Sequence, residues 1–154
     1  MDQKATFDAI ADLIITLVSR MGMTVTVEQE DSLQYGRVFN MSGRDAHSLV
    51  GRQGSHLHAL GMLIRMMSVK KYGSVPSFII DIDDYYRKRQ WYLKETLRKG
   101  IQQAQRTGKP VPLEPMPHYE RRIVHTFAQQ QFSGIVTTSS GREPYRYVVI
   151  TPTA

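Results

Sequence analysis

The sequence predicts an α+β protein with two small domains joined by a basic helix. Segments with the 3.6-residue period of amphipathic helices alternate with short segments rich in β-branched residues. The clearest boundary is Thr107-Gly108-Lys109-Pro110, where a long helical pattern ends and a proline-rich stretch begins. Residues 84–110 carry eight basic and two acidic side chains, in a chain of 154 residues with a net charge of +6. We therefore predict domains at 4–83 and 111–152, with 84–110 as the basic linking segment.

The first domain is predicted to begin with a helix over Lys4–Met21, because apolar residues recur there at steps of three and four. Gly22 follows as the glycine that commonly ends a helix. Alternating apolar and polar residues predict a strand over 23–27, a turn at Asp31-Ser32 and a second strand over 33–41. Acidic side chains are frequent in this segment, so we do not expect it to contact phosphate.

A very tight turn with two glycines three residues apart lies between helical segments at 44–50 and 57–72. Glycine permits a positive φ and the close approach of another backbone. The start of the following helix offers unpaired N–H groups and partial positive charge to a phosphate. A plain connector between helices is the alternative interpretation. The residues of this candidate binding site are Gly51, Arg52, Gln53 and Gly54.

A buried strand is predicted over 78–83, followed by a helix over 84–106 with Asp84 as its N-cap. One face of this helix is apolar. The adjacent face carries three cations and one aromatic residue, namely Arg87, Trp91, Lys94 and Arg98. Such a face can hold a sugar-phosphate backbone and stack a base. Alternatively, Trp91 seals the helix against a neighbouring element and the cations only keep the surface soluble. We interpret the methionines of the preceding helix, such as Met62 and Met66, as core filler.

The second domain begins with the proline-rich stretch 111–117, which is unsuited to a helix or an inner strand. The apolar period then predicts a helix over His118–Gln131. Two strands over 134–138 and 145–150 are predicted to form a hairpin.

The helix of the second domain contains Tyr119-Glu120-Arg121-Arg122-Ile123-Val124-His125, in which Arg121 and His125 share one face because they are four residues apart. Together with the hairpin over 140–150, this segment resembles the Arg-x-x-x-His single-strand nucleic-acid-binding domain. The predicted order in the first domain, helix, two strands, helix, Gly-x-x-Gly, helix, strand, resembles a type II K-homology (KH) domain. In this order the two resemble the bacterial Jag family, also called SpoIIIJ-associated or KhpB-type proteins, over about Lys4–Pro152.

The resemblance implies an RNA-binding regulator rather than an enzyme. In this family the KH module binds single-stranded RNA and often pairs with a small single-KH protein, and the family is associated with control of cell elongation and division. Self-association through the KH domain is a further expectation. The resemblance makes the glycine turn a clamp for the RNA backbone and gives a second contact set of Arg121, Arg122 and His125. Phosphates would also be drawn by Arg87, Lys94 and Arg98.

The sequence differs from the family pattern in three places. Gln53 stands where family loops usually carry a second basic residue, which weakens the expected phosphate contact. The N-terminal Jag domain and linker of many members have no counterpart here, so recruitment through that part is not expected. Pro117-His118 replace the usual Asn-Pro before Tyr119, which removes the expected N-cap side chain.

Three alternatives stay open. In the first, Arg121 pairs with Glu120 or Glu143 and His125 is hydrogen-bonded inside the second domain. In the second, the chain is a protein-interaction or dimerisation module with weak RNA binding. In the third, it is a nuclease with His125 as base, although no carboxylate cluster for metal ions accompanies that histidine in the sequence.

Composition excludes several other classes. The sequence has no cysteine, so disulfides, thiolate metal sites and cysteine nucleophiles are excluded. No apolar run approaches the roughly 18 residues that a membrane span needs, and the acidic N-terminus is unlike a signal peptide. We expect a cytoplasmic protein without an integral membrane segment. We expect no cofactor or metal, because the spacing of His56 and His58 does not face one ligand site on a helix.

Overall fold

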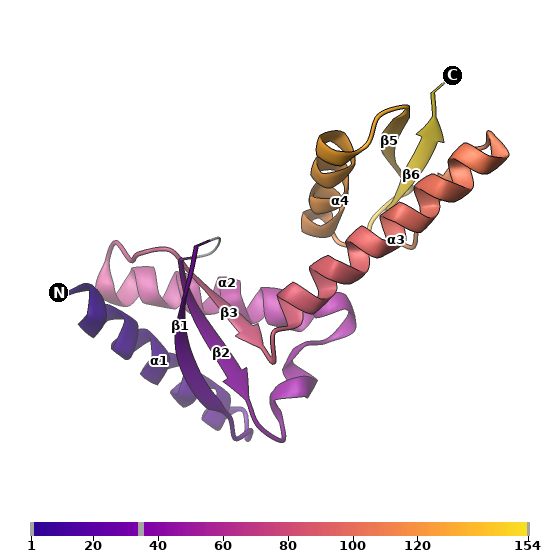
Figure 1. Ribbon diagram of the computed structural model, residues 1–154. Helices are drawn as coiled ribbons and strands as arrows, with labels where there is room; N and C mark the ends of the chain where they lie inside the picture. Colours follow the sequence, from indigo (N-terminus) through magenta and orange to yellow (C-terminus); the bar gives the residue numbers. More distant parts are fainter. Residues whose placement is uncertain (1, 34–35, 154) are drawn as a thin grey trace. The chain divides into compact units, whose positions relative to one another are not determined.

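The computed structural model describes residues 2–33 and 36–153. The chain divides into two compact units, Met1–Tyr86 and Arg87–Ala154 (Figure 1). Each unit has its own three-stranded sheet and its own buried core. The predicted α+β class is therefore confirmed. Within the described ranges, no helix has the length and apolarity that crossing a membrane requires.

The first unit contains two long helices, two short 3₁₀ helices and one sheet. In chain order these are α1 (Gln3–Arg20), β1 (Thr26–Ser32), β2 (Gly36–Ser42), η1 (Ala46–Leu49), η2 (Arg52–Gly54), α2 (Ser55–Tyr72) and β3 (Phe78–Ile82). β2 is the central strand, antiparallel to β1 and parallel to β3. This element order is the one that the KH resemblance predicted, with the helix before the glycine turn reduced to a single 3₁₀ turn.

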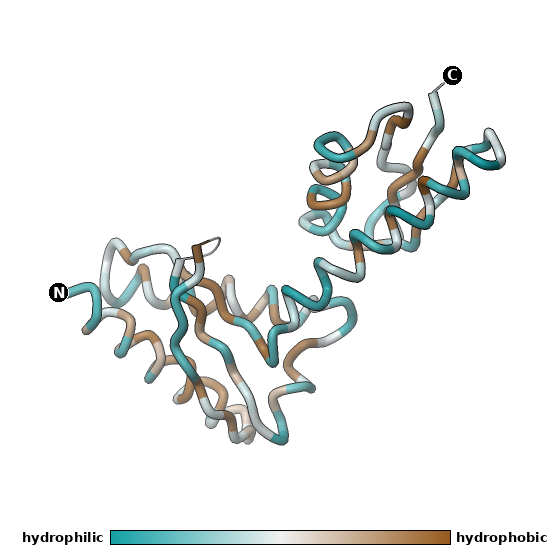
Figure 2. Tube along the Cα trace, in the orientation of Figure 1, coloured by the Kyte–Doolittle hydropathy of each residue, from teal (hydrophilic) through white to brown (hydrophobic). Residues whose placement is uncertain are grey.

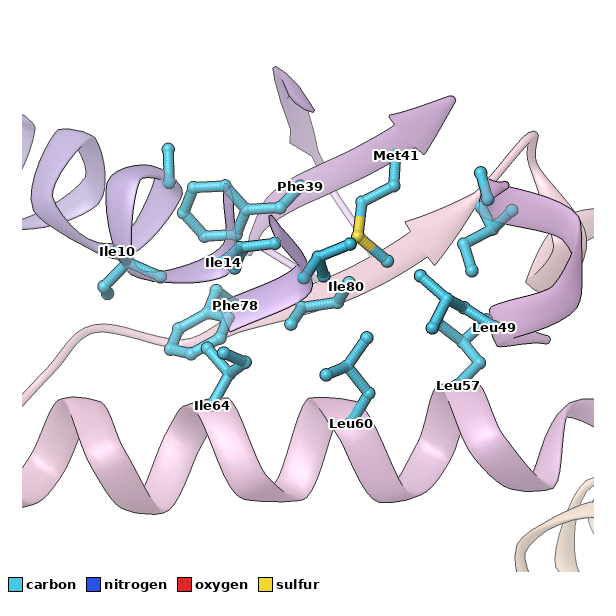
Figure 3. Close-up of a cluster of buried hydrophobic side chains, with 14 of the residues drawn as sticks. Ile10, Ile14, Phe39, Met41, Leu49, Leu57, Leu60, Ile64, Phe78 and Ile80 are labelled. Atoms are coloured by element: carbon cyan, nitrogen blue, oxygen red, sulfur yellow. The ribbon is translucent and has the colours of Figure 1, made fainter. Parts of the chain in front are cut away.

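The core of the first unit lies between the sheet and its two long helices. Phe39 and Met41 of β2 and Ile80 of β3 are almost fully buried and face the apolar sides of α1 and α2 (Figure 3). Leu49, just before the glycine turn, and Leu57, just after it, lie side by side at one end of this cluster. Burying a side chain of this size contributes about 1.5–3 kcal/mol. Both ends of the glycine turn are therefore anchored in the core.

The predicted position of the first strand pair is wrong by several residues. β1 begins at Thr26 rather than at residue 23, and it includes Asp31-Ser32, which were predicted to form the turn. The register pairs Ser32 with Gly36. Residues 34–35 of the predicted second strand lie outside the described residues. The error arises because the second half of β1 is polar, and backbone pairing with β2 overrides its low strand propensity.

The second unit combines two helices with a small antiparallel sheet. Its elements are α3 (Tyr85–Thr107, from Arg87 onward), β4 (Val111–Pro112), α4 (His118–Gln131), β5 (Ile135–Ser140) and β6 (Tyr147–Pro152). β6 lies between β4 and β5. The bounds of α4 are those predicted, and both hairpin strands are displaced by only one or two residues. Pro112 is tolerated because β4 is a short edge strand.

The basic helix α3 forms one wall of the second core. Leu93, Leu97 and Ile101 of α3 are almost fully buried and belong to the same cluster as Ile150 of β6. A Cβ atom added to Gly100 would lie 2.6 Å from the Cδ1 atom of Ile150, so α3 passes very close to the sheet. Most of α3 is hydrophilic, with apolar residues recurring along one side (Figure 2). The apolar stripe therefore has a structural role, and the remaining faces carry the charge.

Candidate nucleic-acid interface

The glycine turn has the positive φ angles that its sequence predicts. Gly51 has φ 70° and ψ −177°, a conformation that is essentially restricted to glycine. Gly54 is left-handed with φ 76°, and Gln53 between them has φ 52°. A Cβ atom on Gly51 would lie 2.4 Å from the Cγ atom of His56. The turn therefore requires glycine at both positions for different local reasons.

The backbone N–H groups at the start of α2 are already hydrogen-bonded, which contradicts the expectation of unpaired groups there. Four consecutive amides donate to carbonyl oxygens of the turn itself: Gly54 to Gly51, Ser55 to Arg52, and both His56 and Leu57 to Val50. A phosphate at this turn would be attracted by the dipole of α2 and by the side chain of Arg52, which is exposed. The charge of Arg52 thus matters more than the sequence alone suggested.

Tyr85 supports the glycine turn from behind. Gly54 is buried, and a Cβ atom placed on it would lie 2.6 Å from the Cε1 atom of Tyr85. Tyr85 follows a turn in which Asp83 and Asp84 both have positive φ angles, 48° and 58°. Two consecutive left-handed non-glycine residues persist only where the surroundings enforce them. The turn between β3 and α3 is therefore closely packed against the glycine turn.

A buried carboxylate holds the β3–α3 turn together. Asp81 accepts hydrogen bonds from the backbone N–H of Ile82 at 2.8 Å and of Tyr86 at 3.2 Å. Burial raises the pKa of Asp81 above its ordinary value of 3.8, while these hydrogen bonds oppose the change. Asp81 thus caps the start of α3 at Tyr86, a role that sequence reasoning gave to Asp84.

A groove of about 210 Å³ lies between α2 and β3, beginning one turn after the glycine turn. Its lining is His58, Gly61, Met62, Arg65, Phe78, Ile79, Ile80 and Tyr86. The guanidinium of Arg65 donates to the carbonyl oxygen of Phe78 at 2.5 Å and lies 4.4 Å from the centre of its ring. The groove thus combines an apolar floor with polar groups, a suitable surface for a flat base.

Sequence reasoning missed this groove and misplaced two of the methionines of α2. Met62 is 56% exposed and Met66 is 62% exposed, so the interpretation of both as core filler is wrong. The available signal was the helical period, because Leu60 and Ile64 define the buried stripe and Met62 and Met66 lie off it. Membership of the groove depends on β3, which no local pattern in α2 could reveal.

On α4, a pocket of about 360 Å³ has a strongly basic lining. The residues are His118, Arg121, Arg122, His125, Thr126, Ser139 and Arg146, with no acidic side chain among them. Arg121, Arg122 and His125, the three residues predicted from the second motif, are therefore brought together in one pocket. His118 and Arg146 join them from the start of α4 and from the loop before β6.

Arg121 is committed to contacts inside its own unit. It is only 4% exposed, and its guanidinium donates to the carbonyl oxygen of Met116 at 2.7 Å and to the Glu143 carboxylate at 2.5 Å. The hydrogen bond from Arg121 lowers the pKa of Glu143 below its ordinary value of 4.5. Of the two partners proposed for Arg121, Glu143 is confirmed and Glu120 is wrong. Arg121 thus positions the loop of Glu143 against α4.

His125 is also hydrogen-bonded inside the second unit, as the first alternative predicted. Its Nδ1 atom lies 2.7 Å from the hydroxyl of Thr137, and its Nε2 atom lies 2.8 Å from that of Ser139. Burial, followed by the charge of Arg121, lowers the pKa of His125 below its ordinary value of 6.5. A neutral imidazole donates through one nitrogen and accepts through the other. Near pH 7, His125 therefore orders two hydroxyl groups of β5 and adds no positive charge.

We expect an NMR titration of the His125 ring to give a pKa below 6.5. Because the folded protein then binds this proton more weakly than the unfolded chain, His125 contributes stability above its unfolded pKa. That contribution is lost as the pH falls through its folded pKa. Replacement of Thr137 and Ser139 by alanine removes both partners and serves as the comparison. A His125 pKa above its ordinary value in the wild type would show that the imidazole is charged and faces solvent.

The cations of α3 differ in how much they are already engaged. Lys94 and Arg98 lie over the Phe127 ring, with the Lys94 nitrogen 4.9 Å and the central guanidinium carbon of Arg98 5.4 Å from its centre. Arg98 also forms an ion pair with Glu95. Arg87 is exposed. The structure thus keeps Lys94 and Arg98 together on one side of α3.

Other surfaces suit a polyanion less well. A depression of about 620 Å³ in the first unit is lined by Asp2 and Asp31 as well as by Lys4 and Arg37, so its charges balance. In the ranges 2–33 and 36–153, no group of three or more histidine and acidic side chains could hold a metal ion.

Three relatives match most of the chain, and each is named RNA-binding protein KhpB. The protein from Clostridium symbiosum is 36% identical over 131 residues, covering 84% of this chain and 58% of the relative. The protein from Lactiplantibacillus plantarum is 28% identical over 142 residues, with coverages of 92% and 44%. The protein from Bacillus subtilis is 32% identical over 113 residues, with coverages of 73% and 54%. The chain thus spans about half the length of these relatives.

The family model of the Arg-x-x-x-His domain, whose name abbreviates that motif, matches residues 93–152. The matched range starts at Leu93 on α3 and runs to the end of β6, so it includes the basic pocket with Arg121 and His125. None of the three relatives is named as an enzyme. The relatives and the domain match together show that this chain belongs to the KhpB (Jag) family of RNA-binding proteins.

Proposed function

We propose that this chain is a regulatory protein that binds single-stranded RNA through two contact sets, one on each unit. The observation that carries the proposal is the glycine turn, where exposed Arg52 stands beside a groove that combines apolar and polar groups. The names of the relatives support RNA as the ligand. In the proposed organisation, residues 4–83 form the KH module, 84–110 the basic helix and 111–152 the second module.

In the first contact set, the backbone of the RNA crosses Gly51, Arg52, Gln53 and Gly54. Arg52 and the dipole of α2 attract a phosphate, while the absence of side chains at the glycines lets the RNA backbone approach closely. The following bases enter the groove between α2 and β3. There Met62 offers a deformable apolar surface and Tyr86 an aromatic edge. Gln53 adds a polar contact without charge, so Arg52 is the main cation of this set.

In the second contact set, Arg122 is the residue most available to a phosphate because it is exposed while Arg121 is buried. Arg146, also exposed, lines the same pocket. Arg121 and His125 act mainly by positioning, Arg121 through Glu143 and His125 through the hydroxyl of Ser139, which the RNA contacts. Arg87, Lys94 and Arg98 of α3 supply further attraction for phosphates, which are read without sequence preference.

The proposal is tested by fluorescence anisotropy with a labelled, mixed-sequence single-stranded RNA at two salt concentrations. Four to six phosphate contacts predict a slope of about −3 to −4 in a plot of log affinity against log salt. We expect the double variant Arg52→Asp with Gln53→Asp, and separately Arg122→Glu, to weaken binding. Removing one phosphate contact should also reduce the slope by about one.

A matched control is Arg20→Glu, which changes the charge by the same amount as Arg122→Glu on an exposed residue outside both contact sets. This variant should bind like the wild type, and all variants should retain the circular dichroism of the wild type. Equal binding by the wild type and both test variants would contradict the assignment of the contact sets. Absence of RNA binding by the wild type would favour the alternative, a protein-interaction or dimerisation module.

We further propose that this RNA binding takes place in the cytoplasm, where cellular RNA is available, and is linked to control of cell elongation or division. A small single-KH protein, or a second copy of this chain through the KH module, is the proposed protein partner. This part of the proposal rests on the family resemblance. Co-purification of a small single-KH protein with the tagged chain, in the presence and absence of ribonuclease, tests it.

A further inference from the structure

A tryptophan is exposed on the charged side of α3. Trp91 is 66% exposed, so the interpretation that it seals α3 against a neighbouring element is wrong for its own unit. It precedes Leu93, part of the buried stripe, by two residues, which places the two side chains about 200° apart around the helix. The indole therefore points away from the core of the second unit.

The neighbours of Trp91 along α3 are mainly cations. Arg87 and Lys88 lie one turn before it and are exposed, and Lys94 lies one turn after it. The nearest acidic residue on this side, Glu95, is in an ion pair with Arg98. A large aromatic side chain that is left exposed between cations does not stabilise the core. Its chemistry matches a ligand that has both flat aromatic groups and negative charges.

We propose that the Trp91 face of α3, formed by Arg87, Lys88, Trp91 and Lys94, is a stacking platform for a base of single-stranded RNA. The indole stacks on the base, and the flanking cations hold the adjacent phosphates. This inference rests on the proposed function and adds a third contact between the glycine turn and the basic pocket in the sequence. Charge complementarity favours RNA over a protein partner, because a mostly basic rim attracts a polyanion more strongly than it attracts a neutral or basic protein surface.

Trp91 is the single tryptophan of the chain, so its own fluorescence reports on stacking. The full chain is titrated with a single-stranded oligoadenylate of about 12 nucleotides, within the range that one binding fold typically covers. Intrinsic fluorescence and the anisotropy of a labelled oligonucleotide are measured in parallel. We expect the indole emission to be quenched with the same midpoint as binding. Trp91→Ala should weaken binding about 5- to 150-fold, and Trp91→Phe should weaken it less because a ring remains.

An abasic oligonucleotide of the same length separates stacking from charge. It retains the phosphates, so it should bind weakly without quenching, and Trp91→Ala should bind it as the wild type does. Trp91 is exposed, and circular dichroism of the variant should match the wild type. Unchanged dichroism with reduced affinity for the oligoadenylate alone would assign the effect to stacking.

Three outcomes would overturn the inference. Binding of the oligoadenylate without quenching, and with equal affinity for Trp91→Ala, would leave the proposed function intact and reject the platform. Absence of RNA binding by the wild type would reject both. Loss of a dimer in Trp91→Ala, measured by sedimentation, with RNA affinity unchanged would show that this face is an interface between two copies of the chain.

Discussion

Glu120→Ala is expected to destabilise the second unit by about 3–5 kcal/mol, the cost typical of breaking a buried ion pair. The Glu120 side chain has no solvent exposure, and it receives two hydrogen bonds from the guanidinium of Arg89, at 2.7 and 2.9 Å. Arg89 is itself only 18% exposed. Removal of the carboxylate leaves the cation of Arg89 poorly solvated and without its charged partner. The loss therefore exceeds the value of a hydrogen bond alone.

Unfolding in denaturant, followed by circular dichroism and by the fluorescence of Trp91 in the second unit, measures this effect. Glu95→Ala is the matched control, since Glu95 also pairs with an arginine but is partly exposed on α3. That variant should lose less than about 1 kcal/mol. The double variant Arg89→Met with Glu120→Leu should recover much of the lost stability, because it removes both charges. Equal losses for Glu95→Ala and Glu120→Ala would contradict the account of a buried pair.

Gly54→Ala is expected to cost about 2–4 kcal/mol, combining a left-handed backbone with overpacking against Tyr85. Gly54 has φ 76°, and the added Cβ would lie 2.6 Å from the Cε1 atom of the Tyr85 ring. Tyr85 packs against the core of the first unit, so the ring cannot move without disturbing the β3–α3 turn. The glycine turn would shift instead, and RNA binding by the first contact set should weaken as well.

Gly61→Ala provides the comparison for this prediction. Gly61 lies inside α2, and a Cβ atom there would meet nothing within 4 Å. Alanine is favoured over glycine within a helix by roughly 0.5–1 kcal/mol, so this variant should gain stability. Thermal and denaturant unfolding of the two variants decide between them. If Gly54→Ala is as stable as Gly61→Ala, the close packing of Tyr85 on the turn is refuted.

The elements that could be predicted from sequence are those with strong local signals. α4 has a clear apolar period, and its bounds, His118–Gln131, are those predicted. The positive φ angles of Gly51 and Gly54 follow from their spacing in a tight turn. The gathering of Arg121, Arg122 and His125 in one pocket follows from their helical spacing. In each case, neighbours in the sequence determine the geometry.

The features that could not be predicted depend on residues distant in the sequence. Glu143 rather than Glu120 pairs with Arg121, because Glu120 points to Arg89, 31 residues away, in the core of the unit. The start of α2 offers no unpaired amide at Gly54–Leu57, because the turn folds back and its own carbonyl groups accept those hydrogen bonds. These outcomes are decided by tertiary packing and turn geometry, which residue spacing does not encode.

The most direct test of the central claim, that RNA contacts both units, is the salt-dependent affinity of the combined variant Arg52→Asp, Gln53→Asp and Arg122→Glu. The account predicts weaker binding than in either parent variant, because the altered residues lie on separate units and contribute independently. It also predicts a slope of log affinity against log salt smaller than that of the wild type by about two. Wild-type affinity and slope in the folded combined variant would contradict it.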